Sequence, residues 1–119
     1  MYNITAEGER YKSEFNFLSR SEYIKIHWVY PDNFNKVEQI KESEMIGKNI
    51  RTHLQQQNNG KLMEREKTAD GYNFILIGED ADALHKSISP ALEHVKYGKG
   101  SFLEIIYDRE NGHSKKIDL

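Results

Sequence analysis

The sequence predicts an α+β fold, an antiparallel sheet of five to seven strands with two amphipathic helices packed on one face. Three observations predict this class. Several runs are β-branched or aromatic, and some alternate apolar and polar residues at the period of a strand. A stretch in each half carries apolar residues at helical spacings of three and four. Short turn sequences join neighbouring strands, which favours antiparallel pairing. The length of 119 residues predicts a single domain spanning residues 1–119.

The first part of the chain is expected to form strands. Residues 1–10 hold few apolar side chains and are predicted to be a lead-in or an edge strand. Tyr11–Phe17 alternates aromatic and polar side chains, which is typical of a half-buried strand. Tyr23–Tyr30 is β-branched and aromatic and is the clearest strand of this half. Pro31 ends it, because proline has no N–H to donate to a sheet. One face of the strand presents Ile24, Ile26 and Trp28.

The next stretch is expected to hold two elements, because its apolar face changes direction near Ser43. On a helical wheel one group of apolar residues is Phe34, Val37, Ile40 and Met45, and another is Ile46, Ile50 and Leu54. We therefore predict a short element from Phe34 to about Lys41, whose type the pattern leaves open. A helix should follow from about Glu44 to Gln57, with Ser43 as its N-cap. Asn58-Asn59-Gly60 is typical of a helix end.

The second half predicts two hairpins separated by a helix. Lys61–Lys67 and Tyr72–Ile77 should pair across a turn at Ala69-Asp70-Gly71. The helix should run from about Asp82 to Val95, with Pro90 as a kink or a new first turn. Gly98-Lys99-Gly100 should end it. The last hairpin is expected to consist of Phe102–Tyr107, a loop at Asp108–His113 and Ser114–Leu119.

An internal similarity links the two predicted helices. Met45–Leu54 lines up with Ala83–Leu92 at an offset of 38 positions, and a Gly-Lys pair follows each segment. One interpretation is a duplicated helix-plus-hairpin unit in one sheet. The other is that two amphipathic helices share leucine and isoleucine spacing by chance.

Composition excludes several classes of function. The chain has no cysteine, which excludes disulfides, thiolate zinc sites and cysteine nucleophiles. Its formal net charge is −2, and it has no basic stripe, which argues against nucleic acid as a partner. No apolar run is long enough to cross a membrane, and the polar first 20 residues do not resemble a signal peptide. We therefore expect a cytoplasmic protein that does not contact membranes.

The candidate chemistry is sparse. No histidines stand at the spacing of a helical metal pair, and no serine lies in a GxSxG elbow, so we predict no metal site, cofactor or catalytic residue. Asp82 and His85 are three residues apart on a helix and could touch. Glu79, Asp80 and Asp82 place three carboxylates at a helix start, where the helix dipole favours anions. Their functional interpretation is an acidic patch that binds a basic partner or a cation.

A resemblance to a known class of proteins adds a specific hypothesis. The run from Gly78 to Leu84, the pattern Ile88-x-Pro90-x-Leu92 and the terminal hairpin from Ile105 to Leu119 resemble small bacterial α+β proteins. Among these are the immunity proteins of toxin–immunity pairs, including those of contact-dependent inhibition. The resemblance implies a non-enzymatic inhibitor that docks on a cognate toxin, and for a basic toxin domain Glu79, Asp80 and Asp82 would be the contacts.

Two other functions remain as alternatives. One is a small-ligand-binding protein or small enzyme in which His85, Asp82 or His27 lines a cleft. The other is a nucleic-acid module with a basic patch assembled in the fold. The residues of that patch would be Lys48, Arg51, Arg65 and Lys67. The sequence leaves open whether the chain forms a homo-oligomer.

Overall fold

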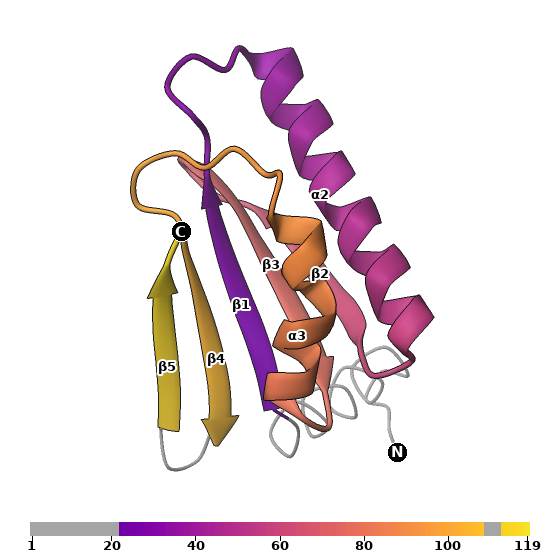
Figure 1. The fold of residues 1–119 in the computed structure, drawn as a ribbon. Coiled ribbons are helices and arrows are strands. Elements are labelled where there is room, and N and C mark those ends of the chain that lie inside the picture. The colour runs from indigo at the N-terminus through magenta and orange to yellow at the C-terminus, as the bar shows by residue number, and fades with distance from the viewer. Residues whose placement is uncertain (1–21, 109–112) are drawn as a thin grey trace, which may run out of the picture.

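The structure, a computed structural model, describes residues 22–108 and 113–119 (Figure 1). The elements are β1 (Glu22–Val29), α2 (Lys36–Gln57), β2 (Lys61–Lys67), β3 (Gly71–Gly78), α3 (Ala81–Leu92), β4 (Phe102–Asp108) and β5 (His113–Asp118). The predicted lead-in at residues 1–10, the predicted strand Tyr11–Phe17 and most of the predicted last loop lie outside the described residues.

The five described strands form one sheet in the order β2-β3-β1-β4-β5, and every neighbouring pair is antiparallel. Both helices lie on the same face of this sheet (Figure 1). The connection β1-α2-β2 passes over β3, and the connection β3-α3-β4 passes over β1. This alternation is the split β-α-β topology of ferredoxin-like folds, with β5 added at one edge. The predicted fold class is therefore confirmed.

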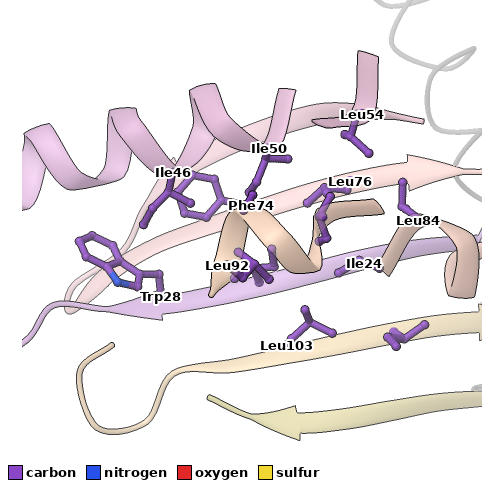
Figure 2. Close-up of a cluster of buried hydrophobic side chains, with 14 of the residues drawn as sticks. Ile24, Trp28, Ile46, Ile50, Leu54, Phe74, Leu76, Leu84, Leu92 and Leu103 are labelled. Atoms are coloured by element: carbon purple, nitrogen blue, oxygen red, sulfur yellow. The ribbon is translucent and has the colours of Figure 1, made fainter. Parts of the chain in front are cut away.

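The core lies between the helices and the sheet face that they cover. Alternate residues of the strands point toward the helices, and Ile24, Trp28 and Phe74 are 0 % exposed (Figure 2). The helices add Ile46, Ile50, Leu54, Leu84 and Ile88, among others. The alternation predicted for the first described strand is confirmed, because Ile24, Ile26 and Trp28 all lie in this core.

The opposite face of the sheet, away from α2 and α3, has a mixed character. Cross-strand neighbours Lys25, Glu104 and Lys116 form a row of alternating charge across β1, β4 and β5. Nearer the start of β1, Ile77 and Ile106 lie on either side of Tyr23 and are both buried. The face therefore changes from apolar to charged along the direction of β1.

The prediction of two elements in the region of α2 is wrong. One helix runs through Lys36–Gln57, and its N-cap is Asn35 rather than Ser43. Asn35 Oδ1 accepts from the Glu38 N–H and Glu38 Oε1 accepts from the Asn35 N–H, each at 2.9 Å, which is a complete capping box. Ser43 is an interior residue whose hydroxyl donates to the Ile40 carbonyl at 2.9 Å.

The apolar face changes direction because the first turns of α2 project beyond the sheet (Figure 1). Val37, Ile40 and Met45 are 65 %, 47 % and 51 % exposed, so their positions do not indicate which side of the helix faces the core. The predicted end of the helix is confirmed. Asn58 adopts the left-handed conformation, with φ 52° and ψ 43°, and its N–H donates to the Leu54 carbonyl.

Helix α3 begins where the sequence predicts and ends earlier. The acidic run supplies the start, since Asp80 is the N-cap, but the helix stops at Leu92 instead of near Val95. Pro90 lies in its last turn, where its missing N–H removes one helical hydrogen bond. The Val95 N–H bonds to the Leu92 carbonyl at 3.3 Å, which closes a turn. Gly98 lies beyond this turn and donates its N–H to the Val29 carbonyl, so it docks the connection on β1.

The internal similarity coincides with the buried positions of both helices. At the offset of 38, Ser43, Ile46, Ile50 and Leu54 correspond to Ala81, Leu84, Ile88 and Leu92, and all eight are buried. A hairpin follows each helix, but the two hairpins attach differently. The first contacts β1 through its second strand, β3, whereas the other contacts β1 through its first strand, β4. The helices are therefore equivalent in packing, while the hairpins are not equivalent in the sheet.

Candidate functional site

Four carboxylates surround the first turn of α3, and we call this group of Glu22, Glu79, Asp80 and Asp82 the acidic end. Asp80 Oδ1 accepts from the N–H groups of Asp82 and Ala83, at 3.0 and 3.2 Å. Glu22, at the start of β1, accepts from the Ala81 N–H at 2.8 Å. Carboxylates thus satisfy the first amides of the helix, which would otherwise form an anion-binding end.

The acidic end carries charge that the described residues do not neutralise. Within residues 22–108 and 113–119, the one ion pair closer than 4.0 Å is His27 with Asp70, which lies at the other end of the strands. Three of these carboxylates also act on one side chain, that of Tyr107. Its hydroxyl donates to Asp82 Oδ1 at 2.7 Å. This hydrogen bond, with burial and the charges of Asp82, Glu22 and Asp80, raises the pKa of Tyr107. Among the described residues, the acidic end therefore gathers four carboxylates that form no close ion pair.

A cavity of about 440 Å³ adjoins the acidic end. Residues 58–61, from the α2–β2 connection and the start of β2, line it together with residues 77–80, from the end of β3 and the β3–α3 connection. The second group includes Glu79 and Asp80. Its volume falls within the range of roughly 300–1,000 Å³ that is typical of ligand pockets.

Close backbone contact between the two connections forms the base of this cavity. A Cβ added to Gly60 would lie 2.5 Å from the Ile77 carbonyl oxygen, and one added to Gly78 would lie 2.6 Å from the Asn59 carbonyl oxygen. A larger residue at either position would push the connections apart. The two glycines therefore fix the spacing of the cavity walls.

Asn59 ties the same connection to α3. Its Nδ2 donates to Ser87 Oγ at 2.6 Å and to the Ala83 carbonyl at 3.3 Å. Its Oδ1 is buried without a hydrogen-bond partner. Because a buried oxygen is closed to ligands, Asn59 holds the wall of the cavity and does not present a binding group.

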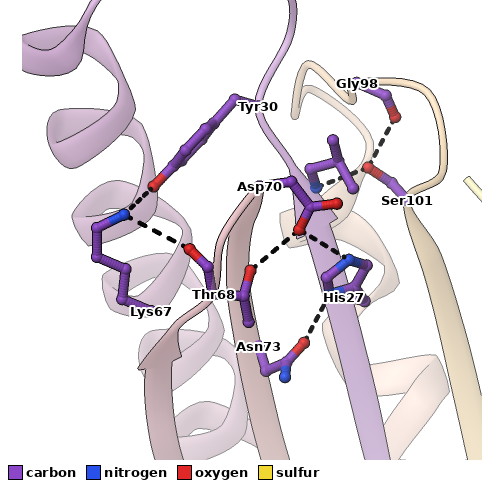
Figure 3. Close-up of polar contacts among 9 residues, drawn as sticks. His27, Tyr30, Lys67, Thr68, Asp70, Asn73, Gly98 and Ser101 are labelled. Atoms are coloured by element: carbon purple, nitrogen blue, oxygen red, sulfur yellow. Dashed lines mark hydrogen bonds and ion pairs between the residues drawn. The ribbon is translucent and has the colours of Figure 1, made fainter.

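A second cluster lies at the opposite end of β1, on the sheet face away from α2 and α3 (Figure 3). His27 Nδ1 lies 2.7 Å from Asn73 Oδ1, and His27 Nε2 lies 3.4 Å from Asp70 Oδ1. Since an amide oxygen only accepts, Nδ1 carries the proton in this contact. The imidazole also packs against Phe102, with ring centroids 5.3 Å apart. The ring is thus held in one orientation by a carboxylate and an amide.

The residues singled out in the sequence are not all brought together. Glu79, Asp80 and Asp82 meet at the acidic end, as their proximity in sequence requires. Asp82 bonds to Tyr107, whereas His85 lines a separate hollow with Ser89 and Leu92. Glu22 and Tyr107 were missed, because they come from strands 59 and 25 residues away from their partners.

Two residues of the predicted basic patch contact aromatic rings. Arg65 lies over the Tyr72 ring at 5.3 Å, and Lys67 lies over the Tyr30 ring at 5.6 Å. Both residues therefore contribute to packing beside α2, where Lys48 and Arg51 are exposed.

No three or more His, Asp or Glu side chains converge closely enough to hold a metal ion in the part of the chain that the structure describes. None of the described helices is long and apolar enough to cross a membrane. In comparisons with known proteins, no protein-family model, no curated protein and no solved structure matches the chain.

Proposed function

We propose that this protein is a non-enzymatic protein-binding domain that docks through its acidic end on a basic surface of its partner. The observation that carries the proposal is the grouping of four carboxylates without a basic neighbour within ion-pairing distance among the described residues. Complementary charge steers such encounters and selects partners of opposite sign.

The specific role that we propose is neutralisation of a cognate bacterial toxin. The resemblance of the last third of the chain to immunity proteins supports this role. The architecture is compatible with it, because the carboxylates lie at the start of β1, in the first turn of α3 and in the two-residue connection between β3 and α3 rather than on a long loop. A preorganised charged surface loses little conformational entropy on binding.

The test is affinity capture from lysate of the source organism, with the wild type and the variant Glu79→Gln/Asp80→Asn/Asp82→Asn as baits. The amide oxygens keep the helix cap and the acceptor for Tyr107 while the charges disappear. The control, Glu44→Gln/Glu64→Gln/Glu66→Gln, removes the same charge from exposed residues elsewhere.

We expect a partner that is retained by the wild type and the control, is lost with the acidic-end variant and is released as salt rises. That partner should arrest growth when expressed alone and be harmless when co-expressed with the wild type. Equal capture by all three baits would overturn the docking surface. A differentially captured partner that is harmless on its own would overturn the toxin role.

A second candidate function, a small enzyme or ligand-binding site at His27, is favoured by the oriented imidazole. Under this alternative, His27→Gln would abolish binding of a metabolite found in a thermal-shift screen, and the acidic-end variant would not.

A further inference from the structure

The cavity beside the acidic end has a chemistry that the docking proposal does not specify. We propose that it receives an arginine side chain of the partner; this rests on the proposed function, because it assigns the anchor of that same interface. Glu79 and Asp80 supply carboxylates on the β3–α3 side, and Gly60 and Gly78 supply backbone surface.

The charge of the lining selects a cation. The first amides of α3 are already bonded to Glu22 and Asp80, so they are not available to an anion. Asp80 binds these amides through Oδ1, and its Oδ2 has no hydrogen-bond partner among the described residues. Glu79 is exposed at the adjacent position. Two neighbouring carboxylates can thus accept hydrogen bonds from one incoming group.

The shape and the mixed lining favour arginine over a small inorganic cation. The lining offers two carboxylates, fewer than the convergent donors of a metal site, and no such metal site exists in the described residues. An arginine has an apolar stem that suits the glycine-lined wall, and a planar tip with five N–H donors that pair with carboxylates. Arginine is also enriched among residues that dominate binding energy at interfaces.

Lys61 provides an internal check on this assignment. It is the one basic side chain among the described residues that line the cavity. Its ammonium repels an incoming guanidinium, so removing its charge should strengthen binding of a cation and weaken binding of an anion.

The test uses the full chain and a probe that is independent of any partner. N-acetyl-arginine amide is titrated into labelled protein, and the backbone amide resonances are followed by NMR. N-acetyl-citrulline amide is the control, because its shape is nearly the same and it lacks the charge. We expect saturable shifts at residues 60–61 and 77–80 with arginine that are absent with citrulline.

Three variants sharpen the result. Glu79→Gln/Asp80→Asn should weaken arginine binding about tenfold, since it removes charge-assisted hydrogen bonds. Lys61→Gln should strengthen binding, and Glu64→Gln/Glu66→Gln should leave it unchanged. Equal shifts with citrulline, shifts spread over other surfaces, or no shift up to the solubility of the probe would each overturn the proposal.

Failure of the arginine proposal can be distinguished from failure of the proposed docking function. If arginine binds in the cavity but no partner is captured through the acidic end, the docking proposal fails and the cavity is a site for a free cationic ligand. If a partner is captured through the acidic end and arginine does not bind, the partner docks without this anchor.

Discussion

The two ends of the sheet differ in what their side chains do. At the aromatic end, which we define by Trp28, Tyr30, Phe34 and Tyr72, rings pack edge to face or tilted at centroid distances of 5.4–6.4 Å. At the acidic end, carboxylates cap a helix beside a cavity and form no ion pair closer than 4.0 Å with a described residue. The first end stabilises the fold by burial, and the second organises polar groups at its surface.

Under the proposed docking function, this difference assigns stability to one end of the protein and binding to the other. Trp28 is 0 % exposed, and its indole Nε1 donates to the Lys96 carbonyl at 2.7 Å, so the aromatic end is complete without a partner. At the acidic end the first amides of α3 are bonded, whereas the carboxylates form no close ion pair within the described ranges 22–108 and 113–119. Substitutions should therefore change stability at one end and binding at the other.

The largest effect on stability should come from Trp28→Ala. It removes a fully buried ring and leaves the Lys96 carbonyl without its donor. We expect a loss of about 3–5 kcal/mol in the free energy of unfolding, measured by urea titration with circular dichroism. Tyr107→Phe, at the acidic end, should cost much less because it removes one exposed hydrogen bond. Similar losses for the two variants would contradict the separation.

The next prediction compares two buried glycines whose replacement by alanine should have opposite effects on stability. A Cβ at Gly71 would lie 1.7 Å from the Trp28 carbonyl oxygen, so Gly71→Ala should force β1 and β3 apart and destabilise by about 3 kcal/mol. A Cβ at Gly47, inside α2, would find its nearest neighbours at 3.8 Å. Gly47→Ala should therefore stabilise by up to about 1 kcal/mol. Thermal unfolding of both variants measures the difference, and destabilisation by Gly47→Ala would refute the packing around α2.

A smaller effect separates the cap from the charge of Asp80. Asp80→Ala loses both hydrogen bonds to the first turn of α3 and should cost about 0.5–2 kcal/mol. Asp80→Asn keeps an oxygen acceptor and should change stability by only about a few tenths of a kcal/mol. The same urea titrations report both values. If Asp80→Asn is as harmful as Asp80→Ala, the charge itself stabilises the fold, and the acidic end is not reserved for binding.

The smallest effect is a dependence of the free energy of unfolding on alkaline pH, to which one tyrosine at each end contributes. Burial raises the pKa of Tyr97 to about 12, while the hydrogen bond to Asp82 and nearby carboxylates raise that of Tyr107. In the folded protein each of these tyrosines holds its proton more tightly than in the unfolded chain. Their contribution to the free energy of unfolding is therefore fully present below pH 10 and is lost as the pH rises toward 12. Tyr97→Phe and Tyr107→Phe should each flatten this alkaline decline. Salt should lower the Tyr107 pKa more than that of Tyr97, measured by ultraviolet titration.

Sequence patterns predicted the parts of the fold that depend on neighbouring residues. The strand Lys61–Lys67, the turn before Gly71 and the acidic start of α3 were all predicted, because turn and cap chemistry is local. The position of α2 was predicted only in part. The wheel treats every apolar residue as core-facing, and Val37, Ile40 and Met45 are exposed.

The candidate site was predicted only where it is continuous in sequence. Glu79, Asp80 and Asp82 lie within four residues, so they had to be close together. Glu22 and Tyr107 join them through strand pairing, and alternation predicts the face of a residue without predicting its neighbours across the sheet. The cavity depends on the approach of two connections at Gly60 and Gly78, which no local pattern indicates.

The most direct test of the central claim is the affinity of the captured partner for Glu79→Gln/Asp80→Asn/Asp82→Asn, measured beside the wild type and the Glu44→Gln/Glu64→Gln/Glu66→Gln control. The account predicts a loss of at least about tenfold for the acidic-end variant alone, with a weaker salt dependence and an almost unchanged free energy of unfolding. Equal affinities for all three proteins would contradict the claim that the acidic end is the binding surface.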